Sequence, residues 1–124
     1  MEINPEEDLK INVSNLGEEF RRFSLVLYRY SQHRAKIDSM RDLAKAKLKE
    51  IRAETRKRIK LDKTEKWTEN SLEAEIDTDP AVMDAQRSFI RAEHDASTWS
   101  GAVESMRAKK DCLIQLGADA RKEK

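Results

Sequence analysis

The chain has 124 residues, of which 40% are charged and 38% belong to the hydrophobic set AVILMFWYC, with a formal net charge of +1. This length fits one domain, and three glycines and two prolines are too few for an all-β fold, which needs frequent turn signals. So much charge cannot enclose a thick globular core, whereas long amphipathic helices can each bury one narrow stripe. We therefore expect an all-α protein whose long helices assemble with other helices.

The chain is predicted to begin with a flexible acidic N-terminal arm over residues 1–13. A first long helix is predicted over 14–63, with a basic C-terminal half. Its apolar residues recur at alternating steps of three and four, a heptad-like pattern typical of a coiled coil, with skips at Arg34 and Arg41. These apolar residues are Leu16, Phe20, Phe23, Leu27, Tyr30, Ile37, Ala44, Leu48 and Ile51.

An acidic linker containing a short helix is predicted over 64–79, followed by a second long helix over 80–120 and a disordered tail over 121–124. Asp79 followed by Pro80 is a strong helix start, because Asp caps helix N-termini and Pro favours the first helical position. Gly101 lies inside the second apolar stripe and is expected to mark a close helix crossing. The stripe consists of Met83, Phe89, Ile90, Ala96, Trp99, Val103, Met106, Leu113 and Leu116. The predicted fold is two long antiparallel helices joined by a short helical linker.

Charge is distributed unevenly along these elements. Residues 42–63 carry nine Lys or Arg against four acids, whereas residues 64–79 carry six acids and one Lys. The basic block can be a ridge that neutralises phosphates or a solvated helix face, and charge alone leaves both interpretations open. The acidic stretch can cover the basic ridge of a neighbouring subunit, dock a basic partner protein or form a solvated connector. Trp67 can stack a base or anchor a turn, and the anchor is favoured.

Nothing in the sequence indicates an enzyme. Two histidines and the single Cys112 lack the paired spacing of a zinc site, and no glycine-rich phosphate loop is present. We therefore expect no catalytic residue, metal or cofactor. A lone cysteine excludes an intrachain disulfide and fits a reducing cytoplasm. The acidic N-terminus and the lack of a long apolar run predict neither a secretory leader nor a membrane span.

Two short motifs resemble a known family. Residues 100–109 (SGAVESMRAK) are similar to the Ser-Gly-Ala signature in the second long helix of UvsY-like phage recombination mediator proteins. Residues 58–62 (RIKLD) resemble the basic-x-basic-Leu-Asp end of that family's first long helix. The order of elements is also similar over roughly residues 20–118. The N-terminal arm matches nothing in the family, and the linker is shorter and more acidic, so the roles of both stay open.

The resemblance implies a protein of DNA recombination and repair, without enzymatic activity. Such proteins bind single-stranded DNA without sequence preference and help a RecA-like recombinase displace a single-strand-binding protein. They form ring-like homo-oligomers, heptameric in the best-known member, and a phage-encoded chain would act in the bacterial host cytoplasm. The family's DNA-contacting basic pair maps onto Arg58 and Lys60. The charge pattern adds four candidates, Arg52, Arg56, Lys57 and Lys63.

Two other functions stay open on the same residues. One is a structural coiled-coil scaffold that forms oligomers but does not bind DNA. The other is a regulator whose acidic stretch docks a basic partner protein.

Overall fold

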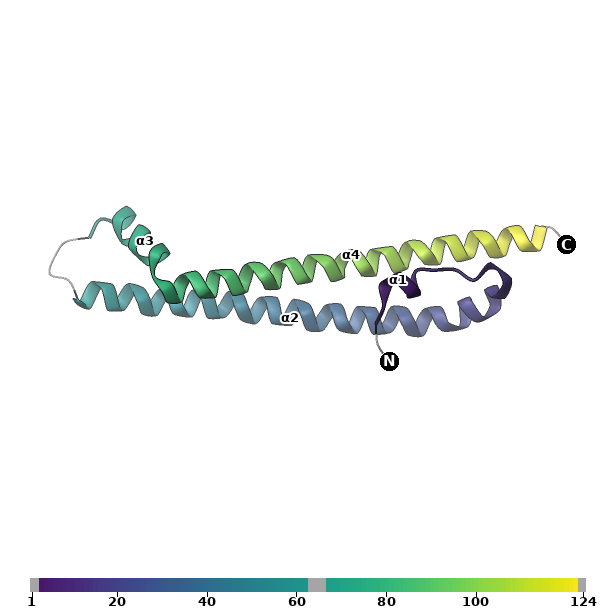
Figure 1. The fold of residues 1–124 in the computed structure, drawn as a ribbon, viewed down its shortest axis with the longest axis horizontal. Coiled ribbons are helices and arrows are strands. Elements are labelled where there is room, and N and C mark those ends of the chain that lie inside the picture. The colour runs from purple at the N-terminus through teal and green to yellow at the C-terminus, as the bar shows by residue number, and fades with distance from the viewer. Residues whose placement is uncertain (1–2, 63–66, 123–124) are drawn as a thin grey trace. The chain divides into compact units, whose positions relative to one another are not determined.

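A computed structural model describes residues 3–122 apart from 63–66, and every secondary-structure element in this part is helical. The elements are α1 (Pro5–Asp8), a 3-10 helix η1 (Val13–Asn15), α2 (Leu16–Asp62), α3 (Glu69–Thr78) and α4 (Pro80–Lys122) (Figure 1). The all-α class is therefore confirmed, and the ring-like oligomer stays a prediction. No helix in the described part of the chain has the length and apolarity that crossing a membrane requires.

The start of α4 forms as its sequence predicts. The carboxylate of Asp79 accepts a hydrogen bond from the N–H of Ala81 at 3.0 Å, and Pro80 occupies the first helical position. At its other end α4 continues through Lys122, so the first half of the predicted disordered tail is helical. The basic residues Arg121 and Lys122 stand in the last turn, where the helix dipole favours positive charge.

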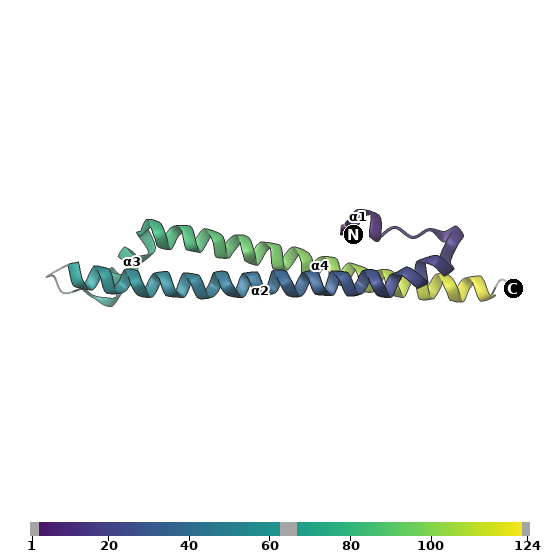
Figure 2. The ribbon, with the colours of Figure 1, turned by 90° about the horizontal axis from the view of Figure 1, so that it is seen from below.

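The chain divides into two compact units, and each contains parts of both long helices. We call Met1–Ile37 with Ala96–Lys124 the arm unit, and Asp38–Asp95 the α3 unit. Within the arm unit, the first part of α2 and the last part of α4 lie side by side and run in opposite directions (Figures 1 and 2). Within the α3 unit, the short helix α3 precedes α4 and lies against the end of α2 (Figure 1).

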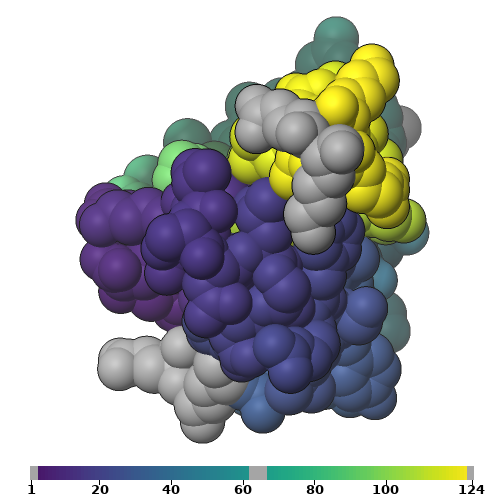
Figure 3. Space-filling model, turned by 90° about the vertical axis from the view of Figure 1, so that its right-hand side faces the viewer, coloured from purple at the N-terminus to yellow at the C-terminus, as the bar shows by residue number. Residues whose placement is uncertain are grey.

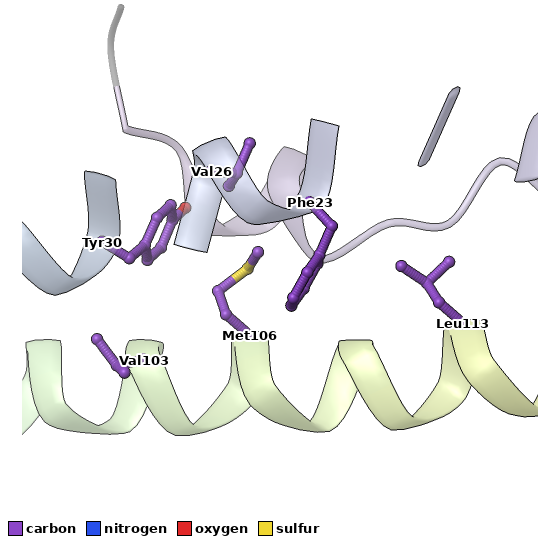
Figure 4. Packing of buried hydrophobic residues seen from close by; sticks show 6 residues of the cluster. All are labelled: Phe23, Val26, Tyr30, Val103, Met106 and Leu113. Carbon is purple, nitrogen blue, oxygen red and sulfur yellow. The ribbon is translucent and has the colours of Figure 1, made fainter. Parts of the chain in front are cut away.

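The core of the arm unit consists of apolar side chains from the facing sides of α2 and α4. Figure 4 shows the α2 residues above α4, with Tyr30 nearest Val103 and Phe23 between Met106 and Leu113. This order is that of an antiparallel pair. The buried set steps by three and four along α2, as expected for a coiled-coil seam. It comprises Phe23, Val26, Tyr30, Val103, Met106 and Leu113.

The buried stripe at the start of α4 differs from the prediction. Met83 and Ile90, which the sequence assigns to the stripe, are 40% and 55% exposed, whereas Val82 and Ala85 are buried. The residues of α4 that face the other helix follow the heptad spacing of three and four, beginning with Val82, Ala85 and Phe89. Several of these facing positions are alanines. Larger apolar residues on the exposed side therefore contribute more to the hydrophobic pattern of the sequence, and the prediction assigned them to the buried stripe.

Gly101 does not stop α4, as the sequence predicts, but the close helix crossing predicted there is not found within the described part of the chain. Gly101 is exposed, and apart from its own stretch of helix no atom of the described residues lies within 4 Å of the position that a Cβ would occupy there. The glycine that approaches another helix is Gly117, whose Cβ position lies 3.4 Å from the ring of Phe20. No glycine in the described residues has a positive φ, so neither position requires glycine for its backbone conformation.

The N-terminal arm is held against the arm unit, whereas the sequence predicts a flexible segment. Ile3 and Ile11 pack against the buried core, and Figure 3 shows the arm, in purple, lying on the beginning of α2, in dark blue. The hydroxyl of Tyr30 donates to Oδ2 of Asp8 at 2.7 Å, and Nζ of Lys109 donates to the carbonyl oxygen of Asp8 at 2.5 Å. Because these partners are remote in sequence, local composition did not reveal them.

Lys109 also forms a nearly buried ion pair with Glu19. Its Nζ lies 3.0 Å from Oε2 of Glu19, and the two side chains are only 9% and 14% exposed. Burial opposes ionisation of Glu19, but hydrogen bonds from Lys109 and from the N–H of Asn12, together with the charge of Lys109, lower the pKa of Glu19 below its ordinary value. Burial and the hydrogen bond to Asp8 raise the pKa of Tyr30. This network joins the arm to both long helices.

Candidate nucleic-acid interface

The candidate cations lie on the last part of α2, within the α3 unit. At 100° per residue, the cations between positions 45 and 60 fall mainly in one sector of the helix surface, about 140° wide. The acidic residues of the same stretch, Glu50 and Glu54, fall outside that sector. The cations of this sector are Lys45, Lys49, Arg52, Arg56, Lys57 and Lys60.

Two arginines of this sector are bound by acidic side chains of α3. Arg52 donates through Nη1 to Asp77 and through Nη2 to Glu73, both at 2.6 Å. Arg56 donates to Glu69 at 3.0 Å and also to the second carboxylate oxygen of Glu73. Each guanidinium therefore spans two acids, and Glu73 bridges both arginines. Each of these contacts is a charge-assisted hydrogen bond, which is stronger than one between neutral groups.

Arg58 lies outside that sector and binds a different acid. Its Nη2 donates to Oδ2 of Asp79, the residue that caps α4. The limited exposure of Asp79 opposes its ionisation, but the hydrogen bond from Arg58 and those from the N–H groups of Ala81 and Val82 lower its pKa below the ordinary value. Arg58 thereby ties α2 to the start of α4 within the α3 unit.

The acidic stretch pairs with the basic end of α2 in the same chain, which none of its three sequence-based interpretations included. The reason lies in the apolar side of α3. Leu72 and Ile76 are 2% and 0% exposed and belong to a cluster with Val82, against which Leu48 and Ile59 pack. Burial of these side chains fixes α3 on α2, and the acids then lie over the arginines.

The lysines of the sector remain exposed. Lys57 and Lys60, both predicted site residues, form no ion pair with any other residue that the structure describes, and the same holds for Lys45 and Lys49. We call Lys45, Lys49, Lys57 and Lys60 the lysine face. Among the predicted DNA-binding residues, the arginines are therefore ion-paired, whereas Lys57 and Lys60 are exposed. The remaining candidate, Lys63, lies outside the described residues.

Two members of the lysine face belong to the predicted basic ridge but were not among the six individual residues predicted to contact DNA. Lys45 and Lys49 share the i,i+4 spacing that continues toward Arg52 and Arg56, so the sequence did contain the signal. Trp67, the candidate for base stacking, is partly buried and packs against the apolar cluster under α3. That position favours the anchor interpretation of Trp67.

No group of three or more His, Cys, Asp or Glu among the described residues is arranged to hold a metal ion. No protein-family model, curated protein or solved structure matches this chain. Three residues of the SGAVESMRAK motif have structural roles, because Val103 and Met106 lie in the core of the arm unit and Lys109 binds the arm.

Proposed function

We propose that this protein binds single-stranded DNA without sequence preference and that the lysine face of α2 is its DNA-binding surface. The proposal rests on one observation. The lysine face is exposed, whereas the neighbouring arginines already form ion pairs with the acids of α3. Lysines on such a surface neutralise phosphates and release counterions, which gives affinity without reading the bases. A lysine ammonium acts as a mobile point charge, so it can follow an irregular single strand.

The lysine face is short, and this limits what one chain can do. From Lys45 to Lys60 the helix rises about 22 Å at 1.5 Å per residue. A few exposed phosphate contacts bind weakly, whereas several copies on one strand would raise the effective affinity. We therefore propose a UvsY-like mediator that acts as a ring-like oligomer, heptameric by that resemblance. In this role it hands single strands from a single-strand-binding protein to a RecA-like recombinase.

The test is fluorescence anisotropy of a labelled oligothymidine at several salt concentrations. One variant combines Lys49→Gln, Lys57→Gln and Lys60→Gln. Its control combines Lys10→Gln, Lys110→Gln and Lys122→Gln, which removes the same charge from exposed positions of the arm unit. Wild type and control should bind with a steep salt dependence. In the lysine-face variant, the magnitude of the slope of log K against log salt should be smaller by about 2. Equal weakening by both variants would show that only net charge matters.

The second candidate function is a helical scaffold without DNA binding. It is favoured by two observations in the α3 unit. The three arginines are neutralised within the chain, and Leu43 and Leu61 are 71% and 85% exposed on the same side of α2. Exposed leucines spaced along one helix side can pack against another helix. A chain that forms oligomers but leaves the oligonucleotide free at low salt would be such a scaffold.

The regulator hypothesis is less favoured. Docking a basic partner protein through the acidic stretch would require that partner to displace Arg52 and Arg56 from Glu73. Glu75 is the exposed acid of α3 for which the structure records no such contact with a described residue.

A further inference from the structure

A pocket in the arm unit gathers cationic side chains that lie apart from the lysine face in sequence. Helix α2 contributes Arg29, Gln32, His33 and Lys36, and Ile3 of the N-terminal arm completes the lining. The cavity has a volume of about 270 Å³. Positions 29, 33 and 36 are spaced i, i+4 and i+7, so they lie on one side of the helix. None of the described residues that line this pocket is acidic.

Arg29 carries an unused hydrogen-bond donor. Its Nη1 is buried and has no hydrogen-bond partner among the described residues. Buried donors are normally satisfied, and an unpaired guanidinium nitrogen is an unfavourable exception. Arg29 also lines the pocket, so rotation of its guanidinium toward an acceptor bound there would relieve this cost. The planar guanidinium presents several N–H groups in a fork, a geometry that matches the oxygens of a phosphate.

The ring of His33 is oriented by an aromatic contact. Its ring centroid lies 4.2 Å from that of Trp99 on α4, with an angle of 71° between the ring planes. This edge-to-face contact sets the ring orientation. Neither nitrogen of His33 makes a hydrogen bond with another described residue, so a ring N–H remains available to a ligand.

We propose that Arg29, His33 and Lys36 bind a phosphate group, with the amide of Gln32 as a further donor. A phosphate offers more oxygens than a carboxylate and can engage several of these side chains at once. Two sources have this chemistry: the backbone of single-stranded DNA and a free phosphate or nucleotide. The site rests on the geometry of the arm unit and stands whether or not the lysine face binds DNA. If the phosphate belongs to DNA, the pocket is a second contact on the same chain.

The experiment is an NMR titration of the full chain, first with inorganic phosphate and then with a short oligothymidine. The Nε–Hε resonance of Arg29 and the ring resonances of His33 report binding. Phosphate should give saturable shifts at these two residues. The variant Lys36→Gln changes an exposed side chain, so it should fold normally and weaken binding about tenfold. Arg29→Gln should abolish binding. The control Arg107→Gln removes an exposed arginine of the same unit that pairs with Glu104 at 2.7 Å, and it should leave binding unchanged.

The two titrations distinguish the ligand sources and the two sites. Shifts with phosphate alone assign the pocket to a free ligand, and shifts with both probes extend it to the DNA backbone. The lysine-face variant should retain the phosphate response, so a failure of the DNA proposal leaves this readout intact. The proposal is overturned if neither probe gives saturable shifts. It is also overturned if Lys36→Gln and Arg107→Gln weaken binding equally.

Discussion

Nη2 of Arg52 donates to Oε2 of Glu73 at 2.6 Å, and this contact ties the last part of α2 to the middle of α3. The two side chains are 31% and 36% exposed, so solvent screens the pair only in part. Glu73 also binds Arg56, which makes it the shared acceptor of two guanidinium groups. The docking of α3 therefore depends on this carboxylate more than on any single acid at its edge.

Glu73→Gln should lower the free energy of unfolding by about 1–2 kcal/mol, because both arginines lose their common charged acceptor. Urea denaturation followed by circular dichroism measures this. The matched control is Glu75→Gln, which changes an exposed acid on the same helix and should stay within about 0.5 kcal/mol of wild type. Equal effects of the two variants would mean that net charge, rather than the shared contact, stabilises α3. Because Glu73→Gln also frees positive charge beside the lysine face, it should raise oligonucleotide affinity.

The ion pair between Glu19 and Lys109 should make the docking of the arm sensitive to acid. The pKa of Glu19 is lowered from its ordinary value of 4.5, so the ion pair contributes its full stabilisation above pH 4.5 and loses it as the pH falls through the folded-state pKa. Because both side chains are nearly buried, Glu19→Gln should cost about 3 kcal/mol at neutral pH. Hydrogen exchange of the arm, measured between pH 3 and 6, should show release in wild type. In the Glu19→Gln variant the arm should exchange quickly throughout, and a pH-dependent arm there would assign the effect to another acid.

Gly101→Ala should stabilise the chain by about 0.5–1 kcal/mol, because alanine favours the helix and a Cβ meets no atom within 4 Å. Gly117→Ala should gain less, since its Cβ would touch the ring of Phe20 at 3.4 Å. Thermal unfolding at several protein concentrations measures both. A gain for Gly101→Ala that turns into a loss at high concentration would reveal a helix of another copy packed closely on Gly101. That result would show that the surface at Gly101, open in the single chain, is covered in an oligomer.

The sequence was informative where the signal was local or periodic. The heptad-like pattern predicted both long helices, and Asp79 followed by Pro80 predicted the start of α4. Periodicity misassigned Met83 and Ile90, because the buried side chains beside them include the small Ala85, and larger exposed side chains dominate the hydrophobic pattern. The helix crossing predicted at Gly101 was not found among the residues that the structure describes, because a glycine in the sequence does not indicate which side of the helix another helix covers.

The site was predictable in its charges but not in their pairing. The basic and acidic blocks were both evident, yet the contact between Arg56 and Glu73 depends on how α3 folds back on α2. The packing of α3 on α2 is fixed by the buried side chains of Leu72 and Ile76. They lie in a short segment whose composition is equally typical of a solvated connector. The arm was missed in the same way, because Asp8 meets Lys109 across 101 positions of sequence.

Paired arginines and exposed lysines should respond differently to the same loss of charge. Lys57→Gln with Lys60→Gln should weaken oligonucleotide binding and lower its salt slope by about 1.4, with no change in the free energy of unfolding. Arg52→Gln with Arg56→Gln also removes two cations, but these side chains hold α3 through Glu69, Glu73 and Asp77. That pair should lower stability by about 1–2 kcal/mol, because the α3 acids lose their partners in contacts that solvent partly screens, and should change the salt slope little. Measuring anisotropy and urea denaturation on both double variants separates the two roles. The assignment of DNA binding to the lysine face fails if the arginine pair controls the salt slope, since the strand would then have to displace α3.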